Sequence, residues 1–175
     1  GELSGLTKLD VCNNQLISLP ESIGQLRILT AIDASNNTLT FLPESMGKLA
    51  KLKFLDVSRN KLTQLPVDLA YCDELEVLNL KNNKIYEMYP RVFVNLSILQ
   101  ELDISQNPII IFHKTMFMYL KCLNTLISSA YKFCCIASVR QCFPPADIFS
   151  SCSDLMSNEI LRFILWIMGV SGLIG

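Results

Sequence analysis

The chain has 175 residues, of which 50% are hydrophobic and 18% are charged, and this composition excludes an intrinsically disordered protein. Fifteen basic and sixteen acidic side chains give a net charge of −1, so there is no basic excess for nucleic-acid binding. The single histidine, His113, argues against histidine-based catalysis or a histidine metal site.

An internal repeat occupies residues 3–133, where the pattern L-x-x-L-x-L-x-x-N-x-L recurs every 23 or 24 residues. Its asparagines are Asn14, Asn37, Asn60, Asn83 and Asn107. A sixth copy has Tyr131 in place of the asparagine, a departure that is typical of a terminal, capping repeat. The five full copies resemble leucine-rich repeats.

The repeat predicts one short strand in each copy, at about residues 7–11, 30–34, 53–57, 76–80 and 100–104. One copy cannot bury its own apolar face, so neighbouring copies are expected to stack. Each asparagine is expected to bond backbone groups of the turn after its strand. The predicted fold class is an α/β leucine-rich-repeat solenoid with parallel strands on the concave face.

The solvent-facing positions of these strands provide the candidate ligand-binding residues. The middle position is acidic in four of five copies, which suits a basic ligand but is also part of the ordinary repeat consensus. The preceding position mixes apolar and charged residues, a composition typical of an interface. The candidates are Asp33, Phe54, Asp56, Val77, Asn79, Glu101 and Asp103.

Four of the seven cysteines lie close together after the repeats, at Cys134, Cys135, Cys142 and Cys152. Their spacing is a poor match to zinc sites and favours disulfides in an oxidising compartment, with reduced thiols or a metal as alternatives. Cys72 replaces a repeat leucine and is expected to be a small buried hydrophobe, whereas Cys12 faces the concave side.

An apolar segment follows the cysteines. Ser153 can cap a helix that becomes uncharged from Phe163 to Gly175, as at the start of a transmembrane helix, with a buried core helix as the alternative. Because the sequence lacks an initial Met and stops within this apolar run, we expect it to be cut at both ends.

The residues after the repeats carry a further resemblance. The motifs are Tyr-x-Phe-Cys-Cys from Tyr131, Cys-x-Pro-x-x-Asp from Cys142, Phe-Ser-x-Cys-x-Asp-Leu-Met from Phe149 and Leu-Arg-x-x-x-Trp from Leu161. In this order they resemble the leucine-rich-repeat-containing G protein-coupled receptors, which include glycoprotein-hormone and relaxin receptors. The short Cys135–Cys142 spacing is similar to relaxin-type receptors, and the Phe149–Met156 motif to the glycoprotein-hormone type.

The receptor resemblance implies a domain organisation and a function. Residues 1–133 would be extracellular repeats that bind a peptide or protein hormone. Residues 134–152 would be a cysteine-rich hinge with the pairs Cys134–Cys142 and Cys135–Cys152. Residues 153–175 would begin the first transmembrane helix of a plasma-membrane receptor that couples to a heterotrimeric G protein.

Other features bear on the same interpretation. Two glycosylation sequons, at Asn36 and Asn95, agree with an extracellular location. The Leu-Pro-Glu-Ser segments of the repeats resemble intracellular scaffold proteins, so an adhesion or scaffold protein with a single membrane anchor is the alternative function. We find no catalytic motif in the sequence and expect neither an enzyme nor a bound cofactor or metal.

Overall fold

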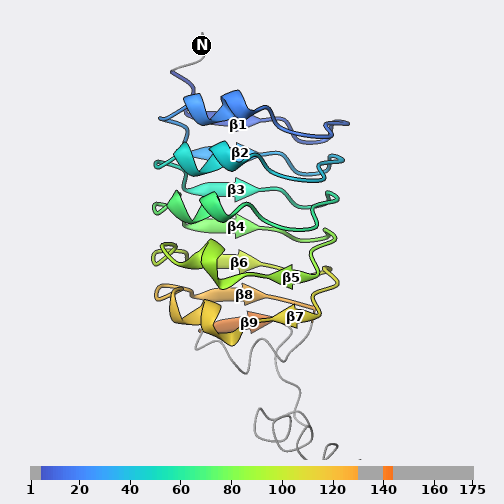
Figure 1. The fold of residues 1–175 in the computed structure, drawn as a ribbon, viewed down its shortest axis with the longest axis vertical. Coiled ribbons are helices and arrows are strands. Elements are labelled where there is room, and N and C mark those ends of the chain that lie inside the picture. Colours follow the sequence, from blue (N-terminus) through green and yellow to red (C-terminus); the bar gives the residue numbers. More distant parts are fainter. Residues whose placement is uncertain (1–4, 130–139, 144–175) are drawn as a thin grey trace, which may run out of the picture.

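The computed structural model describes residues 5–129 and 140–143. Its main element is a parallel sheet in which every strand pairs with the next along the solenoid (Figure 1). The strands, in sheet order, are β1 (Lys8–Asp10), β2 (Ala31–Asp33), β3 (Phe54–Asp56), β4 (Val77–Asn79), β6 (Glu101–Asp103), β8 (Thr125–Ile127) and β9 (Gln141–Phe143). The five strands that the repeat predicts are therefore confirmed, each pairing in the register that the repeat gives.

Short helices form the side of the molecule opposite the strands. They are η1 (Glu21–Gln25), η2 (Glu44–Lys48), η3 (Val67–Tyr71), η4 (Pro90–Phe93) and η5 (Lys114–Met118), and all of them are 3-10 helices. Pro20, Pro43 and Pro66 directly precede the first three helices, where the ring fixes a φ suited to helix entry. The prolines of the Leu-Pro pairs thus turn the chain from the sheet into the helix side.

The hydrophobic core lies between the sheet and the helices. The first leucine of successive repeats is fully buried, as at Leu29, Leu52 and Leu75, because its side chain points into the core. The helices stack so closely that a Cβ atom built on Gly24 would lie 2.6 Å from the Ser45 carbonyl oxygen. Gly47 approaches the Asp68 backbone in the same way, so these two glycines are required by packing.

The repeat asparagines form hydrogen bonds with backbone groups of the turns, as the sequence predicts. The Asn60 side-chain amide donates to the carbonyl oxygens of Ala34, Val57 and Ser58 at 3.0–3.1 Å. Its Oδ1 accepts the Leu39 N–H at 2.9 Å. Ala34 and Leu39 belong to the preceding repeat, so Asn60 satisfies backbone groups of two repeats at once. Asn37, Asn83 and Asn107 do the same.

A second, smaller sheet was not predicted. It pairs β5 (Glu87–Met88) with β7 (Ile111–Phe112) in parallel, next to the helices of the fourth and fifth repeats. The first three repeats have a proline directly after the corresponding leucine, and proline has no N–H for a ladder. Tyr89 and His113 stand at this position in the fourth and fifth repeats, so the local restriction on pairing is absent there.

The main sheet continues beyond the last recognisable repeat. β8 belongs to the sixth copy, and β9 pairs with it in parallel, although residues 141–143 fall inside the segment predicted as the hinge. Cys142 is partly buried against the core, in register with the buried Leu126. The hinge and helix predicted over the remaining residues of 134–175 lie outside the described residues.

No helix within residues 5–129 and 140–143 has the length and apolar character that a membrane crossing requires. The predicted start of a transmembrane helix, residues 153–175, lies outside this part of the chain.

Candidate functional site

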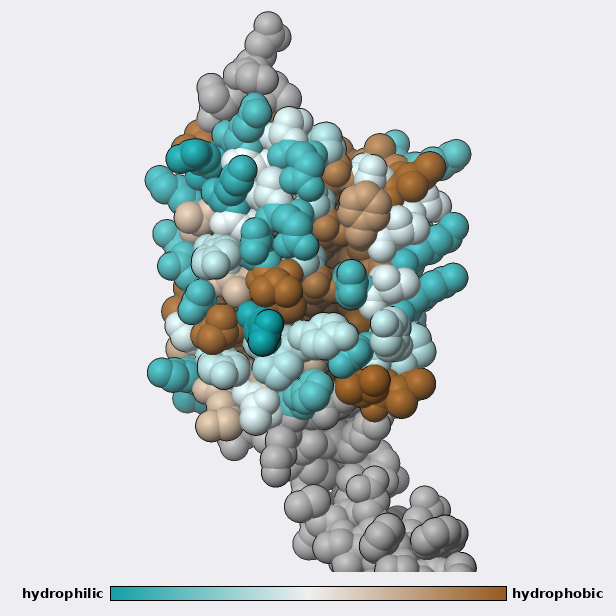
Figure 2. Space-filling model, viewed as in Figure 1, coloured by the Kyte–Doolittle hydropathy of each residue, from teal (hydrophilic) through white to brown (hydrophobic). Residues whose placement is uncertain are grey.

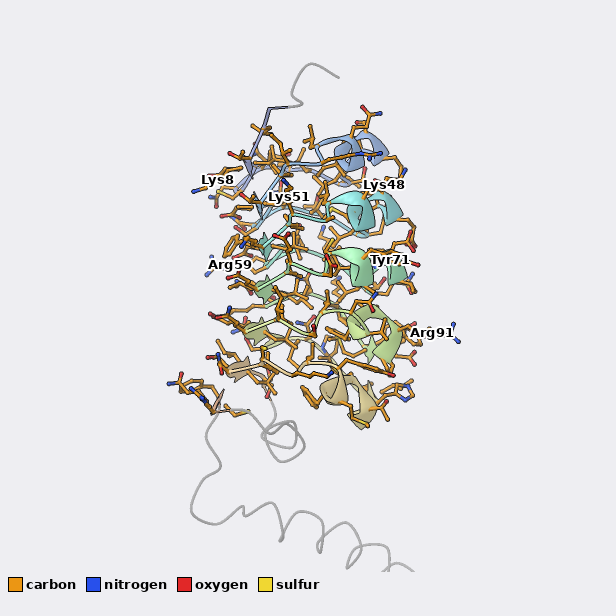
Figure 3. The ribbon with its side chains drawn as sticks, turned by 90° about the vertical axis from the view of Figure 1, so that its left-hand side faces the viewer. Lys8, Lys48, Lys51, Arg59, Tyr71 and Arg91 are labelled. Carbon is orange, nitrogen blue, oxygen red and sulfur yellow. The ribbon has the colours of Figure 1, made fainter. Side chains whose placement is uncertain are left out.

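The solvent-facing side of the seven-stranded sheet, here called the strand face, holds all seven candidate residues. Figure 3 shows the strands along one side of the molecule, with Lys8 and Arg59 projecting there. Lys48, Tyr71 and Arg91 project on the opposite, helix side. On the strand face the pairing places the candidates in two rows, Asp33–Asp56–Asn79–Asp103 and Phe54–Val77–Glu101.

The acidic row has a structural role in each repeat. Oδ1 of Asp33 accepts the Ser35 N–H at 2.9 Å, and Oδ1 of Asp56 accepts the Ser58 N–H at 2.8 Å. These bonds hold the turn after each strand in the manner of an Asx turn. The acidic repeat consensus is therefore explained by local backbone bonding, whatever else the carboxylates contact.

The acidic side chains differ in exposure and in how many of their carboxylate oxygens already accept a hydrogen bond. Oδ2 of Asp56 accepts a hydrogen bond from the Asn79 side chain at 2.8 Å, so both of its oxygens have partners. Asp103 is only 9% exposed and accepts the Ser105 N–H. Asp33 is partly exposed, and its side chain accepts a single hydrogen bond, from the Ser35 N–H through Oδ1. Asp33 is thus the candidate best placed to bind a cation.

The second row has apolar character in its centre. Phe54 is 37% exposed, Val77 is partly exposed, and Glu101 is exposed at the next strand. An ion pair between Lys53 and Glu76 at 3.0 Å joins β3 and β4 just before they begin, and it raises the pKa of Lys53. An exposed aromatic ring beside paired charges is a composition that suits protein contact.

Sequence reasoning missed two residues that continue the strand face. Ile127 of β8 and Phe143 of β9 continue the row that runs from Asp33 to Asp103. Phe143 is 48% exposed and Ile127 is partly exposed. The register of the sixth copy was a signal for Ile127, but no repeat motif precedes Phe143.

The helix side is also uneven in character. Figure 2 shows apolar side chains intermingled with hydrophilic ones on the face that it presents. Tyr71 is 61% exposed and Met118 is 74% exposed, whereas Gln25 and Lys48 hold the equivalent positions of the first two repeats. Val67, on the same helix as Tyr71, is 49% exposed, and Tyr119, directly after Met118, is 37% exposed.

Cys72 is a small buried residue, as the sequence predicts. Cys72, Cys12 and Cys122 carry free thiols. Cys72 is fully buried and donates to the Met46 carbonyl oxygen at 3.2 Å, and burial raises its pKa to about 12. Cys142 is disulfide-bonded, and its predicted partner, Cys134, lies outside the described residues. The pairing itself stays a prediction.

One cluster of possible metal ligands occurs among the described residues. Asp10, Cys12 and Asp33 bring their ligand atoms within 4.8 Å of one another. The cluster is engaged internally, because the Cys12 N–H donates to Oδ1 of Asp10 at 3.0 Å. The neighbouring Asp10 also raises the pKa of the Cys12 thiol, which disfavours the thiolate that a metal needs.

Both sequon asparagines are exposed. Asn36 lies in the turn after β2, where its amide donates to Oδ1 of Asn13 at 2.8 Å. Asn95 lies between η4 and β6.

Comparisons with known proteins agree with this architecture. The leucine-rich repeat family model matches residues 4–62 and 73–127, which is more than half of the chain. A solved leucine-rich-repeat protein of Leptospira interrogans superimposes with a TM-score of 0.70 and 26% sequence identity, over 80% of this chain and 37% of that one.

The expected resemblance to a receptor is confirmed as well. A segment of 60 residues is 48% identical to the G-protein coupled receptor GRL101 of Lymnaea stagnalis. This segment is 34% of the chain but only 5% of that receptor, so the chain spans a small part of its relative. On the repeat register, the stacked parallel strands and the family match, the chain belongs to the leucine-rich repeat family.

Proposed function

We propose that this chain is part of the extracellular domain of a G protein-coupled receptor and that its strand face binds a peptide or protein hormone. The observation that carries the proposal is the 48% identity to the Lymnaea receptor, on a chain whose repeats leave one face of the sheet to solvent. Binding of a protein suits this face because it is broad and combines exposed apolar and charged side chains.

The segment after the repeats would couple binding to the membrane bundle. In this proposal residues 134–152 form a disulfide-linked hinge with the pairs Cys134–Cys142 and Cys135–Cys152. The position of β9 supports the idea, because Cys142 belongs to the same sheet as the proposed hormone-binding residues. A displacement of the sheet would then reach the first transmembrane helix, residues 153–175, and through it a heterotrimeric G protein.

The proposal requires an extracellular location at the plasma membrane. The exposure of Asn36 and Asn95 supports it, because both sequons are open to an attached glycan. The test is to express the full chain in animal cells with an epitope tag before Gly1, behind the signal peptide of a secreted protein. In a matched sample the signal peptide is omitted.

We expect the tagged chain with the signal peptide to be glycosylated, folded and free of aggregates. An antibody against the tag should stain intact cells. The variant that combines Asn36→Gln with Asn95→Gln should lose the glycan mass. A chain that folds only in the cytosol and misfolds after secretion would refute the receptor proposal and favour a scaffold protein.

A further inference from the structure

Large apolar side chains are exposed on or shortly after the helices η3, η4 and η5. This set, here called the helix-side patch, consists of Val67, Tyr71, Val94, Ile98, Met118 and Tyr119. η3 contacts η4, and η4 contacts η5, so the patch extends over neighbouring layers of one stack. Figure 3 shows Tyr71 projecting outward on this side. Exposed apolar side chains that gather in one region mark a surface that contacts another group, or that promotes aggregation when it is left open.

Asn95 lies within the helix-side patch. It stands one repeat of 24 residues after Tyr71 and one repeat of 24 residues before Tyr119. At all three positions the N–H of the following residue donates to the carbonyl oxygen three positions before it, at 3.0–3.3 Å, so the backbone makes the same turn in each layer. The exposed Asn95 side chain therefore projects between the two tyrosines, with Val94 and Ile98 close to it in the sequence.

Asn95 is also the first residue of a glycosylation sequon, in which Leu96 is buried and Asn95 is exposed. N-glycosylation bonds the side-chain amide nitrogen of the asparagine to C1 of an N-acetylglucosamine that comes from a lipid-linked oligosaccharide. The lipid pyrophosphate is the leaving group, and the amide nitrogen gives up one proton to the solvent. A glycan on Asn95 therefore starts inside the helix-side patch.

The composition of the patch suits a sugar better than a second protein surface. Each tyrosine beside Asn95 combines an apolar ring with a hydroxyl group. The C–H groups of a hexose can pack on such a ring, while its own hydroxyls stay in water or bond the tyrosine hydroxyl. Exposed charged residues lie among the apolar ones, at Asp73, Arg91 and Lys121, whereas the core of a protein interface is depleted of charge.

The second sequon has different surroundings and provides a matched control. Asn36 is exposed in the turn after β2, and Asn13 and Arg59 hold the same position in the neighbouring repeats. These neighbours are polar, so a glycan on Asn36 has no comparable apolar surface to cover. Gln106 occupies the same position in the fifth repeat with the same backbone conformation, so this turn accepts a glutamine.

We propose, on the basis of the extracellular location proposed above, that a glycan on Asn95 covers the helix-side patch and prevents two copies of the chain from associating through it. The structure offers a local probe of this cover. Cys122 carries an exposed free thiol, and its N–H donates to the carbonyl oxygen of Ser97, the last residue of the sequon, at 3.2 Å. The glycan that shields the patch therefore also limits access to Cys122.

The test compares the full chain, secreted from animal cells, with the variants Asn95→Gln and Asn36→Gln. Mass spectrometry establishes which sequons carry a glycan. The first readout is the rate at which a bulky maleimide labels Cys122, relative to Cys12 on the strand face of the same chain. The second is the sedimentation of each variant at equal protein concentration. Ser97→Ala removes the same sequon while keeping Asn95, and circular dichroism verifies that each variant is folded.

We expect loss of the Asn95 glycan to speed the labelling of Cys122 relative to Cys12 at least about threefold, because access limits the reaction of a thiol. Asn95→Gln and Ser97→Ala should both sediment as larger species than the parent chain, whereas Asn36→Gln should behave like the parent. Adding Tyr71→Ser and Met118→Ser to Asn95→Gln should restore the sedimentation of the parent, since both side chains belong to the exposed patch.

The possible failures are distinguishable. If Asn95 carries a glycan whose loss changes neither the labelling of Cys122 nor the sedimentation, the cover is overturned and the proposed function stands. The same holds if Asn36 is glycosylated in the secreted chain and Asn95 is not. A chain that misfolds after secretion, or that carries no glycan at either sequon, would overturn the cover and count against the extracellular location as well.

Discussion

Single residues fix the spacing of the repeats through buried hydrogen bonds. Asn60 is only 8% exposed, and its side chain satisfies backbone groups of two repeats. Asn14, in the first described repeat, is exposed and bonds only the nearby carbonyls of Val11 and Cys12. The same residue type therefore has a different energetic weight at the two positions.

We predict that Asn60→Ala lowers the free energy of unfolding by about 2–4 kcal/mol, because it leaves several buried backbone groups without partners. Asn14→Ala should cost less than about 1 kcal/mol, since water can replace its bonds. Urea denaturation of both variants measures the difference. Equal losses would show that the bonds between repeats add little to stability.

The residue before each repeat asparagine adopts a left-handed conformation, which most side chains disfavour. Asn occupies this position at Asn13, Asn36 and Asn82. Arg59 and Gln106 adopt the same conformation, with φ angles of 54° and 56°. We predict that Arg59→Asn stabilises the protein by about 0.5–1 kcal/mol by relieving this strain. The control, Lys61→Asn, lies two residues away at an exposed position outside this conformation and should give no gain in thermal unfolding.

The buried thiol of Cys72 predicts a dependence of stability on pH. Its pKa is raised from 9.0 to about 12 by burial, so the folded state holds the proton that the unfolded state releases above pH 9. The contribution is complete below pH 9 and is lost as the pH rises toward 12. The parent chain should therefore lose stability relative to Cys72→Val over this window.

Alkylation provides a second measurement of the same burial. At pH 8 the exposed Cys122 should react with iodoacetamide while Cys72 stays unmodified until the chain is unfolded, as followed by mass spectrometry. Rapid labelling of Cys72 in the folded chain would contradict the tight packing around it.

Candidate residues were predictable from sequence to different degrees. The repeat register placed all seven on one face, because strand periodicity alone decides which side a residue faces. It did not distinguish the 9% exposure of Asp103 from the open position of Asp33, since that depends on neighbouring strands. Phe143 was missed because β9 has no repeat motif.

The secondary-structure elements were also predictable from sequence to different degrees. The strands followed from leucine spacing, and the prolines marked where the chain turns away from the sheet. The pairing of β5 with β7 was not predictable from a pattern shared by all repeats, because it occurs where two repeats depart from the Leu-Pro pair. Pairing between distant segments requires three-dimensional proximity that a local pattern does not encode.

Stacking of the 3-10 helices depends on two glycines. We predict that Gly47→Ala destabilises the protein by about 1–3 kcal/mol, because a Cβ atom would collide with the Asp68 backbone of η3. Gly5→Ala is the matched control, since a Cβ atom there meets nothing within 4 Å. Thermal unfolding of both variants measures the difference, and a neutral Gly47→Ala would mean that η2 and η3 can separate without cost.

On the scale of the whole molecule, the solenoid separates two surfaces of different construction. The strand face presents side chains from consecutive strands in fixed register, whereas the helix side presents short, separate helices with exposed polar and apolar residues. A strand face held by continuous backbone pairing suits the proposed ligand binding, because little order has to be gained in this chain when a ligand binds.

The central claim is that the strand face binds the ligand, and a glycan attached to each side of the secreted chain tests it most directly. Val77→Asn with Asn79→Thr creates a sequon on the strand face and keeps the buried Leu78. Lys48→Asn with Ala50→Ser creates one on the helix side and keeps the buried Leu49. Mass spectrometry verifies that each new glycan is present.

The measurement is the affinity of both glycosylated variants for a peptide that was selected for binding to the parent chain from a phage-displayed library of random linear peptides. We predict that the strand-face glycan abolishes binding, that its enzymatic removal restores it, and that the helix-side glycan has no effect. Undiminished binding to the chain with the strand-face glycan, together with loss of binding to the chain with the helix-side glycan, would contradict the account.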